Sequence, residues 1–182
     1  MRPMRTLDRE PVGAFWALPG EHVELSLDRI VDYPVLAQCL ENWRGLVADG
    51  LPSDVDPLAF PRAAIAGLNL FEFDADADDW RVRLAGRLVS EHVGYELRGT
   101  GLIEAFSEAD RAEVRAAIRA AVARGEPELT RRNFVDPRGR RWSYVRLFLP
   151  FSRNGDRVDH FVTVIDPGSF GRMRSDDQGA QR

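Results

Sequence analysis

Arginine supplies every positively charged side chain of this sequence, which contains no lysine. This excludes chemistry that needs a lysine amine, such as Schiff-base catalysis or the phosphate-binding lysine of a P-loop. Arginines gather around the segment DPRGRRW, which we interpret as a solvated hairpin rather than a phosphate site. The formal net charge is −4, and an acidic chain is not drawn to polyanions at long range. We therefore expect no nucleic-acid partner.

Candidate nucleophiles and metal ligands are few and scattered. The single cysteine, Cys39, stands among apolar neighbours, where a lone thiol is usually a small buried hydrophobic group. No positive charge flanks it to favour the thiolate. His22, His92 and His160 are isolated and show neither HxH nor HExxH spacing. We therefore expect no metal site and no enzymatic activity.

The stretch from Leu84 to Asp110 is rich in glycine, the residue that a phosphate-binding loop would need. Its glycines do not have the GxGxxG spacing of a dinucleotide-binding loop, and no lysine completes a Walker loop. Glycine also serves where the chain needs a positive φ or a close approach of two backbones. We interpret these residues as corners between short elements, with a ligand-cradling loop as the alternative. They are Gly86, Gly94, Gly99 and Gly101.

The spacing of apolar residues predicts the elements that position these groups. A helix is expected from Pro34 to Asp49, followed by the proline-rich connector LPSDVDPLAFP. Apolar and polar residues then alternate in LNLFEFD and WRVRLAGRL, which predicts two strands. Capping and stop signals predict a helix from Ser107 to Arg124, with Ser107 as its N-cap. Three more strand-like runs follow, namely ELTRRNFVD, RRWSYVRLFLPFS and DRVDHFVTVIDP.

This order of elements predicts an α+β fold. We expect a five-stranded antiparallel sheet with helices on one face, plus an N-terminal helical extension. The long helix should pack across the sheet through Val114, Ile118 and Val122. We divide the chain into an extension over residues 1–50, a domain over 51–168 and a disordered tail over 169–182.

With these elements in place, the glycine-rich stretch resembles part of a PAS domain. Two strands, the short helical segment SEHVGYELRGTGLIEAFSEAD, a long helix and a three-stranded meander follow in PAS order. Gly94, Tyr95, Gly99 and Asp110 stand at positions that match the family's motif. The segments LPSDVDP, RVRLAGRLV and VRLFLPFSRNGDRV are similar to a bacterial subfamily of stand-alone PAS proteins without an output domain. The resemblance extends over residues 51–167.

The resemblance implies a sensory or adaptor protein in bacterial signalling, without catalysis of its own. It would bind a small-molecule ligand, a signalling protein partner, or both. Flavin photosensing in this family relies on a cysteine within the stretch that corresponds to residues 88–106, which has none. Haem-binding members usually take their iron ligand from the long helix, which has no histidine, although nearby His92 keeps haem as an alternative. We therefore expect no cofactor and no chromophore.

In PAS-like folds, ligands bind between the sheet and the short helices. Alternation along RRWSYVRLFLP puts Tyr144 and Arg146 on one face, and Arg146 is suited to a carboxylate or phosphate. Both faces of this strand are partly apolar, so alternation does not decide which one lines a cavity. The alternative function is that of an unrelated α+β enzyme using Tyr144, Arg146 and His160 on a small acidic substrate. The predicted ligand-binding residues are Tyr95, Tyr144, Arg146 and His160.

The distribution of apolar residues indicates where the protein is located. No stretch approaches the roughly 18 apolar residues of a membrane span, and no secretory signal is evident. We therefore place the protein in the cytoplasm, away from membranes.

The apolar residues between Leu27 and Leu46, together with the segment GAFWALP, must be buried somewhere. They either cover the outer face of their own sheet or pair with a second copy, and we expect a homodimer.

Overall fold

A computed structural model describes residues 20–94, 96–103, 106, 108–135 and 139–173. The strands are β1 (Glu21–Leu25), β2 (Leu68–Asp74), β3 (Asp79–Leu84), β4 (Glu128–Val135), β5 (Arg141–Phe151), β6 (His160–Ile165) and β7 (Gly171–Arg172). The α-helices are α1 (Pro34–Leu46), α2 (Arg87–Val93) and α3 (Glu108–Arg124). Short 3-10 helices are η2 (Leu27–Asp32), η3 (Pro57–Ala59) and η4 (Arg62–Gly67). None of the described helices is long and apolar enough to cross a membrane.

The strands form one antiparallel sheet in the order β1-β4-β5-β6-β2-β3, and β7 pairs with β5 beside this path. The sheet has seven strands rather than the predicted five. The two additional strands lie outside the predicted domain. β1 adds to the edge of β4, and the two-residue β7 adds to the start of β5. Both are too short for alternation of apolar residues to reveal them.

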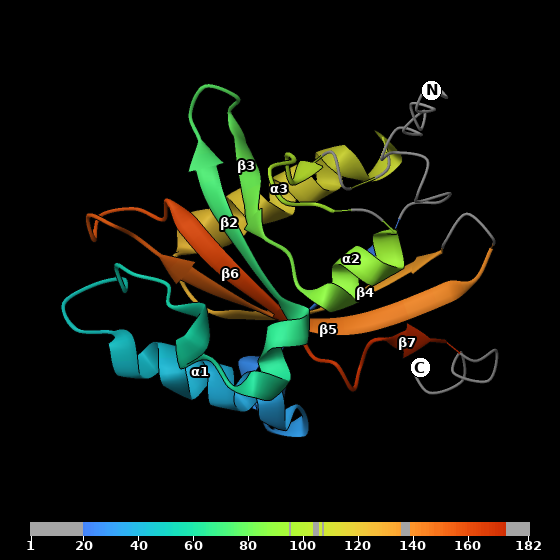
Figure 1. Cartoon of the computed structure of the whole chain (residues 1–182), viewed down its shortest axis with the longest axis horizontal. Coiled ribbons are helices and arrows are strands. Elements are labelled where there is room, and N and C mark those ends of the chain that lie inside the picture. The colour runs from blue at the N-terminus through green and yellow to red at the C-terminus, as the bar shows by residue number, and fades with distance from the viewer. Residues whose placement is uncertain (1–19, 95, 104–105, 107, 136–138, 174–182) are drawn as a thin grey trace, which may run out of the picture.

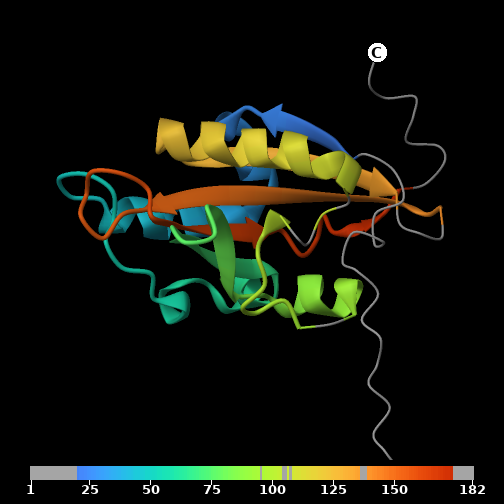
Figure 2. The ribbon, with the colours of Figure 1, turned by 90° about the horizontal axis from the view of Figure 1, so that it is seen from above.

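Helices cover both faces of the sheet, and β5 shows why. Its residues Tyr144, Arg146 and Phe148 face α2 and α3, whereas Leu147 and Leu149 face α1. We call these the α3 face and the α1 face. Figure 1 shows α1 below the sheet and α3 above it. Figure 2 looks onto the α3 face, where α3 and α2 lie on either side of β5 and β6.

The N-terminal helix α1 packs on the sheet of its own subunit. It fully buries Leu36 and Cys39, and the Trp43 indole Nε1 donates a hydrogen bond of 2.9 Å to the Pro150 carbonyl. This is the first of the two arrangements that we considered for its apolar surface. The argument for a dimer that rested on this surface therefore no longer applies, and the homodimer stays a prediction. The segment GAFWALP lies outside the described residues.

The long helix α3 packs on the opposite face as predicted. It buries Val114, Ile118 and Ala121 against the sheet, and Val122 is partly buried. These residues recur at helical spacing, so a single face of α3 supplies all of its core contacts. The predicted N-cap, Ser107, lies outside the described residues.

Candidate ligand-binding cavity

Glycines and one asparagine hold α2 at the edge of the sheet. Asn69 of β2 donates to the Gly67 carbonyl at 3.0 Å, and its Oδ1 accepts from the Gly86 amide at 3.0 Å. A Cβ on Gly86 would lie 2.4 Å from the Ala66 carbonyl oxygen, so only glycine allows this approach. Gly94 ends α2 with a φ of 83°. Gly86 and Gly94 therefore turn corners of the chain, as predicted.

A small cavity of about 80 Å³ lies between α2, the segment after it and the α3 face of the sheet. Apolar and aromatic side chains form most of its wall, as is typical of ligand sites. Its polar side chains come from four different elements, so the sheet and α2 must both be in place to form it. The lining residues are Asn69, Phe71, Val82, Ala85, Val89, His92, Leu97, Leu102, Phe106, Phe134, Tyr144, Arg146, Thr163, Ile165 and Phe170.

Arg146 is the charged residue of this wall. Its Nε donates to the Thr130 hydroxyl at 3.1 Å, and Arg146 makes no ion pair with any described residue. Burial, more than any neighbouring charge, lowers the pKa of its guanidinium below the usual value. An arginine that is desolvated in this way favours an anionic partner, because the charge of Glu128 offsets only part of the cost of burial.

Tyr144 is two residues from Arg146 on the same face of β5. Its ring stacks on Phe170, with centroids 5.8 Å apart, and meets Phe134 edge-on at 6.0 Å. Its hydroxyl forms no hydrogen bond within the described part of the chain. The residue therefore offers the cavity one donor and acceptor beside an apolar ring.

A second, smaller chamber of about 30 Å³ shares Arg146 and Thr163 with the first cavity. Its other polar walls are His22 of β1 and Glu128 and Thr130 of β4. Burial lowers the pKa of His22 to about 4, with further contributions from the charges of Arg146 and Arg132. His22 is therefore neutral near pH 7.

A buried ion pair closes this region beneath α3. Arg132 donates to Asp110 at 2.7 Å, and the two side chains are only 3% and 2% exposed. The other carboxylate oxygen of Asp110 accepts from the Gly20 amide at 2.8 Å. The Arg132 guanidinium also lies 4.9 Å from the centre of the Phe106 ring. Asp110 thus ties the start of α3 to β4 and to the residue that precedes β1.

The structure brings together two of the four predicted ligand-binding residues, Tyr144 and Arg146. His160 lies on the α1 face, where its ring stacks on Phe151 at 5.5 Å and its Nδ1 contacts Asp159. It does not line the cavity, because Phe161, the next residue along β6, occupies the α3 face. Tyr95 lies outside the described residues.

Sequence reasoning missed His22, Asn69, Thr130 and Thr163 as polar residues of this region. His22 enters it only through the pairing of β1 with β4, which places it opposite Arg132. Asn69 and Thr163 are likewise paired across β2 and β6. Polar residues inside otherwise apolar strands were the available signal, because a buried polar group needs a partner.

The cavity does not fit flavin or haem, the two large cofactors considered because of the resemblance to PAS domains. Its volume is well below the roughly 300 Å³ at which pockets for drug-sized ligands begin. Cys39, the only cysteine, lies on the other side of the sheet. The imidazole of His92 is packed against three aromatic rings, with centroids 4.7 Å away for Trp142, 5.2 Å for Phe170 and 5.5 Å for Phe134. The described residues also contain no cluster of side chains suited to a metal ion.

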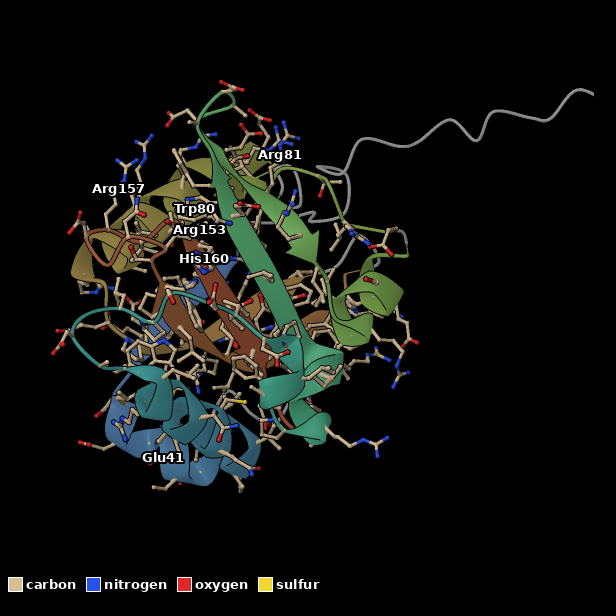
Figure 3. The ribbon with its side chains drawn as sticks, turned by 60° about the vertical axis from the view of Figure 1, so that its left-hand side comes forward. Glu41, Trp80, Arg81, Arg153, Arg157 and His160 are labelled. Carbon is tan, nitrogen blue, oxygen red and sulfur yellow. The ribbon has the colours of Figure 1, made fainter. Side chains whose placement is uncertain are left out.

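An open groove of about 700 Å³ lies at one end of the sheet, where the β5–β6 turn meets the C-terminal end of α3. Trp43, Trp80 and Arg157 are among its lining residues, and Figure 3 labels Trp80 and Arg157. The charged side chains at its rim include Arg124, which is paired with Glu128. None of the four predicted ligand-binding residues lines this groove.

Solved structures with a similar chain path are light-oxygen-voltage (LOV) proteins. The LOV protein of Rhodobacter sphaeroides is 18% identical, with a TM-score of 0.45 over 76% of this chain and 69% of that one. A variant named RsLOV d2 is 17% identical, with a TM-score of 0.44 and the same coverages. An RNA-binding LOV receptor is 18% identical, with a TM-score of 0.45 over 82% of this chain and 39% of that one. No functionally curated protein matches the sequence.

The last of these structures corrects one prediction. We expected no nucleic-acid partner, yet a protein with a similar chain path is described as RNA-binding. Net charge was too coarse a basis for this exclusion, because binding depends on where the charges gather rather than on their sum. We therefore withdraw it.

Family membership follows from the sequence itself. A family model described as the PAS domain matches residues 32–165, which is well over half of the chain. The match includes α1 as well as the strands and helices that enclose the cavity. The antiparallel sheet with α2 and α3 on one face agrees with the fold expected from the resemblance. This chain is a member of the PAS domain family.

Proposed function

We propose that this PAS domain is a non-catalytic sensory or adaptor module that binds a small ligand in the cavity beside Arg146 and signals through a protein partner. The main observation behind the proposal is that the apolar wall of the cavity contains two polar groups whose bonding capacity the described residues leave unused. Arg146 makes no ion pair with a described residue, and the Tyr144 hydroxyl makes no hydrogen bond with one. Ligand sites combine these features, since apolar walls give affinity and a few polar groups fix orientation.

The arrangement favours binding over the alternative enzyme. That enzyme would need Tyr144, Arg146 and His160 to converge on one substrate. Arg146 and Tyr144 face the cavity, whereas His160 is on the α1 face against Phe151. A general base would have to reach the reacting atoms, and His160 has the sheet between it and the cavity.

Native mass spectrometry of the purified full chain tests the proposal. We expect a retained or added small molecule at a ratio of one for each subunit, and the same spectrum reports whether the protein is a dimer. The variant Ala85→Leu would fill the cavity, since Ala85 lines it, and should abolish binding. Ala112→Leu on the exposed face of α3 is the matched control and should bind as wild type does. Equal binding by both variants would place the ligand elsewhere and overturn the proposal.

A further inference from the structure

The electrostatics around Arg146 identify the class of ligand, and this inference rests on the proposed function. Most nearby charges are already compensated. Arg132 is paired with Asp110, and Glu128 is paired with Arg124. Arg146 has only the neutral Thr130 hydroxyl as a hydrogen-bond partner among the described residues. Arg146 therefore makes no ion pair with a described residue, although the charge of Glu128 acts on it, and an anion in the chamber would give it a direct partner.

His22 adds a second polar group to the same chamber. It pairs with Arg132 across β1 and β4, and Arg132 pairs with Tyr144 across β4 and β5. Directly paired residues point to the same face of a sheet, so His22 lies on the face that carries Arg146. Both residues line the chamber of about 30 Å³. An acid group there would contact a guanidinium on one side and an imidazole on the other.

We propose that the cavity binds a short-chain monocarboxylic acid, whose carboxylate lies between Arg146 and His22 and whose apolar part lies beside Tyr144, and that binding promotes protonation of His22. The small chamber has room for little more than a carboxylate, and the cavity of about 80 Å³ limits the apolar part to a few carbon atoms. Arginine suits this role because its planar fork matches the two oxygens of a carboxylate.

Protonation follows from the charges that face His22. Without ligand, its pKa is lowered to about 4 by burial and then by the charges of Arg146 and Arg132. The acidic groups around it are Glu128 and, from α3, Asp110 and Glu113, together with Glu24 on its own strand. Asp110 and Glu128 are engaged by arginines, so they leave its pKa low.

A bound carboxylate would offset the repulsion from Arg146 and raise the pKa of His22. By linkage, the acid should then bind more tightly as the pH falls from about 6.5, the ordinary histidine value, toward 4. The ligand remains ionised in the upper part of this window, down to about pH 5, because alkyl carboxyl groups have ordinary pKa values above about 4. The titrating residue lies on the edge strand β1, so ligand binding would change the charge of that strand.

The first test compares 3-methylbutanoate with its neutral amide, 3-methylbutanamide, by NMR titration of the ¹⁵N-labelled full chain at pH 6. We expect the acid to bind at least about tenfold more tightly, as a charge-assisted pair would give. Arg146→Met should remove this preference, Arg146→Lys should keep part of it, and the exposed Arg44→Met on α1 should leave it unchanged. Equal affinities in wild type would overturn the acid class while leaving the cavity as a ligand site. Failure of both probes to bind would overturn the proposed function as well.

The second test follows the three histidines by NMR during a pH titration, with His22→Gln to assign the signal. In the presence of 3-methylbutanoate the pKa of His22 should rise, and the affinity for the acid should increase from about pH 6.5 to pH 5.5. In His22→Gln the affinity should stay flat over this range. An unchanged His22 titration with the acid bound would remove His22 from the site, even if Arg146 still selects the acid.

Discussion

The two faces of the central sheet differ in the side chains that they carry, although the same strands form both. On the α1 face, β5 and β6 present Leu147, Leu149, Val162 and Val164, each with no exposed surface, against the apolar side of α1. On the α3 face, the same strands and their neighbours carry Arg132, Arg146 and Thr163. Apolar packing stabilises the fold at no electrostatic cost, whereas buried polar groups need partners. Both faces have an apolar core, and the candidate binding chemistry lies on the α3 face alone.

The α3 face also differs within itself. Asp110 and Arg132 satisfy each other and join α3 to β4, so their charges are part of the structure. Arg146 is held by one hydrogen bond to Thr130 and makes no ion pair with an acidic residue in the described part of the chain. A fold that needed Arg146 only for support would pair it as Arg132 is paired. The variants described below test this contrast between Arg132 and Arg146.

Removing the partner of a buried charge should have the largest effect. Asp110→Ala leaves Arg132 uncompensated beneath α3 and frees the Gly20 amide, so we expect a loss of about 3–5 kcal/mol in the free energy of unfolding. Urea unfolding monitored by circular dichroism measures it. The matched control is Glu41→Ala on the surface of α1, which breaks an exposed pair with Arg44 and should cost less than about 0.5 kcal/mol. Figure 3 labels Glu41 on α1. Recovery of stability in Asp110→Leu combined with Arg132→Met would confirm that the isolated charge causes the loss.

On the α1 face the corresponding experiment removes apolar volume. Leu149→Ala leaves a cavity beneath α1 where Leu149 is fully buried, and we expect a loss of about 3 kcal/mol. Leu58→Ala, at a side chain that is 88% exposed, is the control and should change stability by less than about 0.5 kcal/mol. If the ligand site belongs to the other face, Leu149→Ala should leave the affinity for 3-methylbutanoate unchanged while the protein remains folded.

Alternation in β5 predicted this two-faced arrangement from the sequence, because neighbouring residues of a strand point to opposite sides. The same rule explains why Tyr144 and Arg146 were correctly grouped. His160 could not be placed, since its face depends on the register between β5 and β6, where it pairs with Phe151. Alternation within one strand carries no information about register with another.

The N-terminal part was harder to predict for a different reason. The apolar spacing of residues 34–46 correctly indicated α1. Such a pattern identifies the apolar side of a helix but not the surface against which that side packs. It covers its own sheet, so α1 no longer supports pairing with a second copy, which stays a prediction. β1 went unrecognised because EHVEL is short and mostly polar. Without β1, His22 remained an isolated histidine rather than part of the chamber beside Arg146.

Acid should destabilise the α3 face through His22. The unfolded chain binds a proton at this residue below pH 6.5, whereas the folded chain does so only below about 4. Stability is therefore lost as the pH falls through this window, by at most about 3 kcal/mol and by less where solvent reaches the ring. Between pH 7 and pH 4.5, the free energy of unfolding should fall less in His22→Gln than in wild type. Urea unfolding at each pH measures this free energy, and the difference between the two proteins cancels the contribution of other groups. Identical pH dependence in both proteins would mean that His22 does not remain neutral in the folded state.

The smallest change in stability, and the sharpest separation of folding from binding, is expected for Arg146→Met. Methionine keeps much of the apolar stem and removes a desolvated charge that makes no ion pair with a described residue. Replacing a poorly compensated, partly buried charge by an apolar side chain is often neutral or stabilising, so we expect a change within about 1 kcal/mol, toward higher stability. The loss of one hydrogen bond to the neutral Thr130 hydroxyl opposes this gain by roughly 1 kcal/mol. Urea unfolding of the variant and of wild type, each with and without 3-methylbutanoate, decides the matter. Wild type should be stabilised by the acid and the variant should not, whereas a loss above about 2 kcal/mol without ligand would show that Arg146 supports the fold as Arg132 does.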